Sequence, residues 1–185
     1  MEIQSIYQQA IKFAAAKHSE NNQTVPGTML PYVVHLSNVA MEILVASQHS
    51  ADFNVAFAVQ TALLHDTLED TSATADEIAR EFGSETAQAV QALTKNKNLP
   101  HEEQMKDCLR RIQLLPKEVG AVKLADRITN LQKPPGHWNT EKKEQYRNEA
   151  MLILQQLQGT NSYLEQRLGK KITEYEQYRN NAPSS

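Results

Sequence analysis

Four titratable residues directly follow an apolar run in the segment ALLHDTLEDT, residues 62–71. They are His65, Asp66, Glu69 and Asp70, and each is costly to bury without a partner. If one helix runs through the segment, the i, i+4 spacing stacks His65 on Glu69 and the two aspartates on each other. Carboxylates so close together repel one another, and a divalent cation removes that conflict. The alternative interpretation is a helix end that carries solvated charges.

Two further segments carry polar residues with similar chemistry. His35 lies in PYVVHLSNVA among apolar neighbours, and Asp126 and Asn130 lie one turn apart on the polar side of GAVKLADRITNL. A histidine in such company is often a core residue with a satisfied hydrogen bond. An aspartate one turn from an asparagine is equally compatible with a stripe that faces solvent.

In combination, the three segments offer two imidazoles and two carboxylates, from His35, His65, Asp66 and Asp126. This mixture of nitrogen and oxygen donors suits Mn²⁺ or Fe²⁺, with Mg²⁺ or Zn²⁺ as further possibilities. Four protein ligands leave positions on a six-coordinate ion for water and substrate. The pattern therefore favours a catalytic metal site over a structural one.

Helical periodicity dominates the chain, and strand signals are nearly absent, which predicts an all-α, single-domain helical bundle over residues 1–185. Thr74 and Glu77 form a predicted capping box, Gly83 ends the helix that follows, and Ser84 and Thr140 are predicted N-caps. The predicted helices cover residues 3–17, 31–47, 52–70, 74–82, 84–95, 101–114, 116–131, 140–157 and 164–175, and a frayed tail follows at 180–185.

Composition narrows the class of protein. Hydrophobic residues make up 40% and charged residues 22% of the 185 residues, the balance of a soluble globular domain. A net charge of -3 argues against a general nucleic-acid surface, and the apolar runs are too short to span a bilayer. Because Cys108 is the only cysteine and no secretory signal is visible at the N-terminus, we expect a cytoplasmic protein. Oligomeric state stays open.

The segments that carry these residues resemble the HD-domain metal phosphohydrolases. Within them, the likeness is to the hydrolase domain of RelA/SpoT enzymes and to small stand-alone alarmone hydrolases of the metazoan SpoT homologue type. The matching pieces are PYVVHLSNVA, TALLHDTLEDT, VKLADRITNL and LQGTNSYLEQRL, which span roughly residues 30–170. HDxxED together with KLADRxxNL is a specific pair. The resemblance implies an HD-type bundle that binds Mn²⁺ and removes the 3′-pyrophosphate of guanosine tetra- or pentaphosphate with a metal-activated water. The ligands that it implies are His35, His65, Asp66 and Asp126.

Glu69 and Asp70 are the candidate catalytic residues. One turn past the ligands, they are placed to orient the attacking water, to accept its proton or to protonate the leaving oxygen. The alternative is that the two carboxylates only hold His65 in place.

Substrate contacts follow from the same resemblance. It implies that Lys97 contacts phosphate, that Asn130 lies near the nucleoside, and that Trp138 and Tyr146 stack on a purine. An ordinary loop lysine and ordinary packing of the aromatic rings are the alternatives. Further candidates for phosphate contacts are Lys123, Arg127, Lys142 and Lys143.

One loop departs from the family pattern. RelA/SpoT hydrolases usually carry adjacent basic residues before PY…H, whereas this loop reads NNQTVPGTMLPY, with no Lys or Arg from Glu20 to His35. In the family this loop helps to form the nucleotide pocket. The departure therefore concerns recognition of guanine and of the 5′-diphosphate, and it leaves the metal chemistry unaffected.

Three functions follow as hypotheses. The leading one is an enzyme, a Mn²⁺-dependent (p)ppGpp 3′-pyrophosphohydrolase. The second is an HD phosphohydrolase that acts on another nucleotide, such as an adenine alarmone, NADPH or another nucleotide phosphate. The third is a regulatory HD module that binds a nucleotide or a partner protein without turnover. For the enzyme we expect a small-molecule nucleotide as partner, and neither nucleic acid nor a membrane.

Overall fold

The chain folds into α-helices, and no β-strand forms among residues 2–178, which this computed structural model describes. The all-α, single-domain prediction is confirmed. The helices are α1 (Ile3–Glu20), α2 (Val33–Ser47), α3 (Val55–Leu64), α4 (Thr67–Asp70), α5 (Ala75–Phe82), α6 (Ser84–Leu93), α7 (His101–Ile112), α8 (Lys117–Asn130), α9 (Thr140–Gln156) and α10 (Ser162–Tyr175), followed by a 3₁₀ turn, η1 (Glu176–Tyr178).

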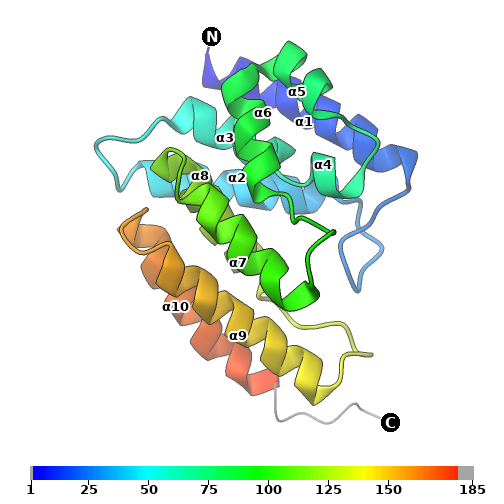
Figure 1. The fold of residues 1–185 in the computed structure, drawn as a ribbon, viewed down its shortest axis with the longest axis vertical. Coiled ribbons are helices and arrows are strands. Elements are labelled where there is room, and N and C mark those ends of the chain that lie inside the picture. Colours follow the sequence, from blue (N-terminus) through cyan, green and yellow to red (C-terminus); the bar gives the residue numbers. More distant parts are fainter. Residues whose placement is uncertain (1, 179–185) are drawn as a thin grey trace.

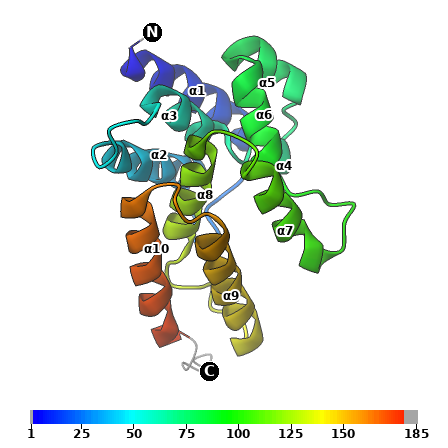
Figure 2. The ribbon, with the colours of Figure 1, turned by 60° about the vertical axis from the view of Figure 1, so that its left-hand side comes forward.

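Helices α2, α3 and α8 form the centre of the molecule. Figure 1 shows α1, α5 and α6 at one end and the α9–α10 pair at the other, and Figure 2 shows the same arrangement from a second side. Each central helix contacts the other two, and α10 joins the bundle mainly through α8. Large side chains that the central helices bury almost completely include Leu36, Ile43, Leu63, Leu64, Leu124 and Ile128.

The predicted helix over residues 52–70 is wrong as a single element. Asn54 caps α3, because its side chain accepts a hydrogen bond from the backbone N–H of Phe57 at 3.1 Å. α3 then ends at Leu64, whose carbonyl accepts a hydrogen bond from Thr67 Oγ1 at 2.6 Å. In a continuous helix that carbonyl would accept from a backbone N–H one turn later. His65 and Asp66 therefore lie in a break between α3 and α4.

Two of the four predicted cap positions are confirmed and two are wrong. Thr74 and Glu77 make the complete capping box, and Gly83 ends α5 with φ +92°. Ser84 is instead the first residue of α6 and makes no capping hydrogen bond. Asn139 caps α9 in place of Thr140, since its side chain accepts from the backbone N–H of Lys142 at 2.8 Å. The predicted tail at 180–185 lies outside the described residues.

The loop between α1 and α2 has an ordered backbone. An isolated antiparallel bridge joins Thr24 to Pro31, and the N–H of Val25 donates to the carbonyl of Leu30 at 2.9 Å. At its tip, Gly27 has φ +77°, and a Cβ there would lie 3.3 Å from Cγ of Pro135. A side chain at this position would be strained and crowded. The tip of this loop thus lies against the loop that follows α8.

Two structural features bear on the predicted cytoplasmic location. None of the described helices combines the length and apolar character that a membrane span requires. Cys108 is a free thiol buried below α6, where its Sγ donates to the carbonyl of Ala92 at 3.2 Å, and burial raises its pKa. A buried thiol of this kind is chemically inert. The cytoplasmic location stays a prediction.

The corrected cap of α9 can be tested by mutation. We expect Asn139→Ala to lower the free energy of unfolding by about 1 kcal/mol, because the Lys142 N–H loses its acceptor at the helix start. Thr140→Ala is the matched control and should change stability by only a few tenths of that value. Urea unfolding monitored by circular dichroism measures both. An equal loss in the two variants would contradict the cap assignment.

Candidate metal centre

Four side chains converge at the centre of the bundle. α2 contributes His35, the break between α3 and α4 contributes His65 and Asp66, and α8 contributes Asp126; one ligand atom from each lies within 4.8 Å of all the others. His65 Nε2 is 2.9 Å from Asp66 Oδ2 and 3.7 Å from Asp126 Oδ1. His35 Nε2 is 3.7 Å and 3.5 Å from the same two oxygens. The structure thus brings together the four ligands that the sequence predicts.

Each of the two imidazoles turns one unpaired nitrogen toward the carboxylates of the cluster. Among the described residues, Nε2 of His35 and Nε2 of His65 are buried atoms with no hydrogen-bond partner. His65 Nδ1 lies 2.8 Å from the carbonyl of Ala62 and donates to it, so Nε2 is the nitrogen that is left to bind a cation. His35 Nδ1 lies 3.4 Å from Thr129 Oγ1. Two buried, unpaired nitrogens that face two carboxylates fit a divalent cation.

The charges at the cluster are strongly coupled. Burial alone would lower the pKa of His65, but the adjacent carboxylates of Asp66 and Asp126 raise it to about 10. Burial would raise the pKa of Asp66, and the neighbouring His65 outweighs it and holds that pKa well below its usual range. For Asp126 the opposing charge is Lys123, with the same result. The raised pKa favours a proton on His65, and a cation bound at Nε2 would compete with that proton.

Neighbouring side chains hold the ligand carboxylates in place. Tyr32 Oη donates to Asp66 Oδ2 at 2.5 Å, and burial raises the pKa of this hydroxyl so that it stays a donor. Asp126 accepts from Asn130 Nδ2 at 2.5 Å and from Lys123 Nζ at 3.0 Å. Lys123 is buried, and its phosphate contact stays a prediction. Tyr32 is not among the predicted site residues, although its position about one helical turn before His35 indicates that it lies near the cluster.

Arg127 is likewise buried. It forms an ion pair with Glu149, and its guanidinium carbon lies 4.5 Å from the centre of the Tyr146 ring. The phosphate contact of Arg127 stays a prediction. Its charge lies beneath Tyr146 and supports that ring through a cation–π interaction.

Glu69 and Asp70 are held by different loops. Glu69 Oε2 accepts from the backbone N–H of Lys95 at 3.1 Å, and Lys97 Nζ donates to the Glu69 carbonyl at 3.0 Å. Asp70 Oδ2 accepts from Gln23 Nε2 at 3.1 Å. Glu69 is half-buried, Asp70 is exposed, and neither forms an ion pair with the metal cluster within residues 2–178. The backbone N–H of Asp70 still donates to the carbonyl of Asp66 at 3.0 Å, so these two residues keep their i, i+4 spacing across the break.

A pocket of about 680 Å³ opens beside the cluster, and we call it the main pocket. His35 and Asn130 line its inner end, and Trp138 and Tyr146 form an aromatic wall, with ring centres 5.1 Å apart. Residues 25–28 and Leu30 line the opposite side. A cavity of this size accommodates a small organic ligand such as a nucleotide. Three of the four predicted substrate contacts line it. Lys97 instead lies beside Glu69.

Comparison with known proteins identifies the family. The HD domain family matches residues 10–163, which is most of the chain, and the chain therefore belongs to this family. The HD-type bundle expected from HDxxED and KLADRxxNL is thereby confirmed.

Individual relatives match over nearly their full length. The guanosine-3′,5′-bis(diphosphate) 3′-pyrophosphohydrolase MESH1 of Danio rerio is 32% identical over 171 residues, 90% of this chain and 92% of that protein. The Homo sapiens protein of the same name is 35% identical over 165 residues, 86% of this chain and 89% of its own length. A solved structure, described as a metazoan ortholog of SpoT that hydrolyses ppGpp, superposes with a TM-score of 0.77 at 28% identity, covering 91% of this chain and 94% of that one.

The hydroxyl of Tyr32 offers a test of ligand positioning. We expect Tyr32→Phe to weaken Mn²⁺ binding about tenfold while the fold is retained, because Asp66 loses the donor that fixes its Oδ2. Tyr7→Phe removes a hydroxyl that is paired with Ser37 instead, and it should bind Mn²⁺ like the wild type. Competition titration against a fluorescent chelator measures both. Equal affinity of the Tyr32 variant and the wild type would refute the positioning role.

The coupling between the metal and the His65 proton predicts a pH dependence. With a pKa raised to about 10, His65 is protonated at neutral pH in the metal-free protein, so metal binding releases about one proton. The apparent affinity for Mn²⁺ should therefore rise about tenfold per pH unit in the neutral range. Calorimetry in two buffers with different ionisation enthalpies gives the number of protons released. An affinity independent of pH would show that His65 carries no proton in the metal-free protein.

Proposed function

We propose that this protein hydrolyses the 3′-pyrophosphate of guanosine tetra- or pentaphosphate in a Mn²⁺-dependent reaction. The observation that carries the proposal is the buried cluster of two imidazoles and two carboxylates that opens onto the main pocket. The names of the full-length relatives support the same substrate class, because those proteins are called guanosine-3′,5′-bis(diphosphate) 3′-pyrophosphohydrolases.

The donor set supports the choice of metal. His35, His65, Asp66 and Asp126 would hold the cation, and two nitrogens with two oxygens suit Mn²⁺ or Fe²⁺, with Mg²⁺ or Zn²⁺ as alternatives. When bound, a divalent cation supplies Lewis-acid activation of water near neutral pH.

Glu69 and Asp70 are the proposed proton carriers. Water attacks the phosphorus bonded to the 3′-oxygen, the bond between these two atoms breaks, and GDP and pyrophosphate form from ppGpp. One proton of the water must leave, and the 3′-oxygen must gain one. The Lys95 N–H fixes the Glu69 carboxylate, and Gln23 fixes that of Asp70, so both acceptors are oriented before substrate arrives.

The main pocket would take the nucleoside. Trp138 and Tyr146 provide faces on which a purine can stack, and Arg127 beneath Tyr146 keeps that ring in place. Asn130 lines the pocket while it also holds Asp126, so it ties the position of the nucleoside to that of the metal. Lys97, exposed and close to Glu69, is the proposed phosphate contact on the acidic side of the cluster.

A second candidate keeps the chemistry and changes the nucleotide. The loop residues that line the main pocket, 25–28 and Leu30, carry no charge. This favours comparison of ppGpp with adenine alarmones, NADPH and other nucleotide phosphates. A screen with Mn²⁺ and Mg²⁺ decides between them, and turnover of ppGpp far above all other nucleotides would exclude the second candidate.

The catalytic role of Glu69 yields a further prediction. We expect Glu69→Gln to lower kcat for pyrophosphate release from ppGpp at least about a hundredfold, because the amide cannot accept a proton. Metal content should stay at the wild-type level. Glu81→Gln, an exposed position on α5, is the matched control with unchanged rate. Wild-type protein that releases no pyrophosphate from ppGpp with Mn²⁺ would refute the proposed function. Full activity of the Glu69 variant would refute only the role of that residue.

A further inference from the structure

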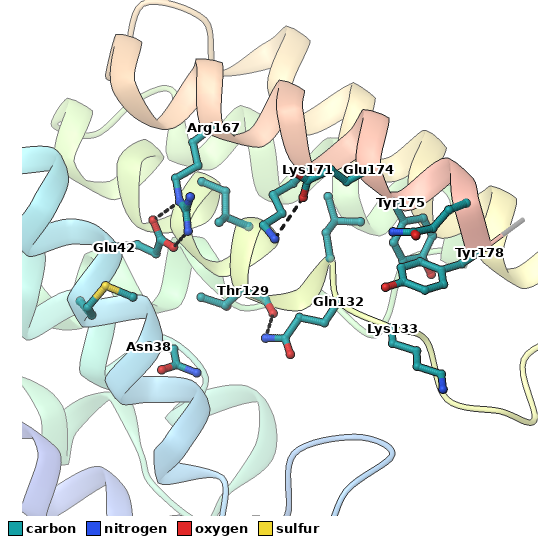
Figure 3. A pocket seen from close by; sticks show the side chains of 14 residues that line it. Asn38, Glu42, Thr129, Gln132, Lys133, Arg167, Lys171, Glu174, Tyr175 and Tyr178 are labelled. Atoms are coloured by element: carbon teal, nitrogen blue, oxygen red, sulfur yellow. Dashed lines mark hydrogen bonds and ion pairs between the residues drawn. The ribbon is translucent and has the colours of Figure 1, made fainter.

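A second cavity adjoins the main pocket, and we call it the side hollow. It has a volume of about 430 Å³ and lies between α2, α10 and the end of α8, as Figure 3 shows. The two cavities are continuous along one edge. The residues that line both are Asn38, Thr129, Gln132, Lys133 and Tyr175.

Two pairs of opposite charges in the side hollow neutralise each other. Arg167 donates two hydrogen bonds of 2.6 Å to the carboxylate of Glu42, which is buried. Lys171 Nζ lies 3.3 Å from Glu174 Oε2. Both pairs are drawn in Figure 3. Lys170 Nζ, outside the side hollow, also lies 3.9 Å from Glu174, so a carboxylate faces each of these cations.

Lys133 differs from these residues. It is exposed, and within residues 2–178 it has no carboxylate in ion-pair distance. In Figure 3 its side chain leaves the loop after α8 and extends away from the two ion pairs. It is also the one Lys, Arg, Asp or Glu among the described residues that line the main pocket. The unbalanced positive charge at the junction of the two cavities is therefore that of Lys133.

A nucleotide with phosphates at both ends needs positive charge at both ends. In the orientation proposed above, the reacting pyrophosphate lies at the metal cluster and the nucleoside lies against Trp138 and Tyr146. Within the main pocket, the other end of the nucleotide would then lie against the uncharged residues 25–28 or against Lys133. Ammonium-to-phosphate hydrogen bonds are charge-assisted and stronger than neutral ones.

We infer that Lys133 is the residue that determines the preference for a phosphate at the 5′ end of the substrate. The inference rests on the proposed function. It assigns to Lys133 the positive charge for a 5′-phosphate that the uncharged loop does not supply. The ligand class is a nucleotide with a 3′-pyrophosphate and one or more 5′-phosphates. Lys133 acts on specificity and takes no part in bond cleavage.

Lys142 is the rival cation. Its Nζ lies 5.7 Å from the centre of the Trp138 ring, and the residue does not line either cavity. A 5′-phosphate that passed the outer face of Trp138 would meet Lys142 instead. The two lysines can be separated by substitution with methionine, which keeps an unbranched side chain only one atom shorter and removes the charge.

The experiment compares two substrates that differ only at the 5′ end: ppGpp, and guanosine 3′-diphosphate with a free 5′-hydroxyl. For Lys133→Met we expect kcat/KM for ppGpp to fall about tenfold or more, and kcat/KM for the 5′-hydroxyl substrate to change less than about twofold. Lys170→Met is the control, since that side chain is 78% exposed on α10 and outside both cavities. It should leave both values unchanged.

Three outcomes would overturn the inference: equal losses on both substrates, no loss on either, or a selective loss in Lys142→Met rather than Lys133→Met. In each of these cases wild-type turnover of ppGpp leaves the proposed function standing. If the wild type releases pyrophosphate from neither substrate, the proposed function and the inference fail together. Circular dichroism spectra equal to that of the wild type establish that each variant is folded.

Discussion

The structure depends on the close approach of two imidazoles and two carboxylates inside a helical bundle. His35, His65, Asp66 and Asp126 come from three separate parts of the chain, and their ligand atoms share a sphere a few ångströms across. Like charges this close, and mostly out of water, repel strongly. Without a divalent cation, the ammonium of Lys123 and the proton on His65 offset part of this repulsion. The proton on His65, the ammonium of Lys123 and a bound divalent cation would each offset the negative charge of the two carboxylates.

The fold meets this constraint with a helix break and with rigid neighbours. His65 and Asp66, the two residues between α3 and α4, are neighbours in the chain and both contribute to the cluster. Leu63 and Leu64 just before the break, and Leu124 and Ile128 around Asp126, anchor both contributors in the core. The position of each ligand is therefore determined by packing as well as by its hydrogen bonds.

Much of this arrangement was predictable from local sequence, and the remainder was not. Helical periodicity and turn residues sufficed for the fold class and most helix positions, and residue chemistry sufficed for the four ligands. At the break, the carbonyl of Leu64 accepts a side-chain hydrogen bond from Thr67, and the helical pattern of the sequence did not indicate that the helix would be interrupted here. The directions of Glu69 and Asp70 depend on Lys95 and Gln23, which reach them from distant loops. The burial of Lys123 and Arg127 likewise depends on tertiary contacts.

The aromatic wall and the metal ligands belong to different parts of the molecule. Tyr146 lies on α9 and Trp138 lies just before it, and the α9–α10 pair joins the bundle mainly through α8. Three of the four ligands come instead from α2 and the α3–α4 break. Substitutions on the α9–α10 pair can therefore change the surface on which a nucleobase stacks while the residues of the metal cluster stay unchanged. Evolution can in this way diversify the molecules that such a bundle accepts without rebuilding its reactive centre.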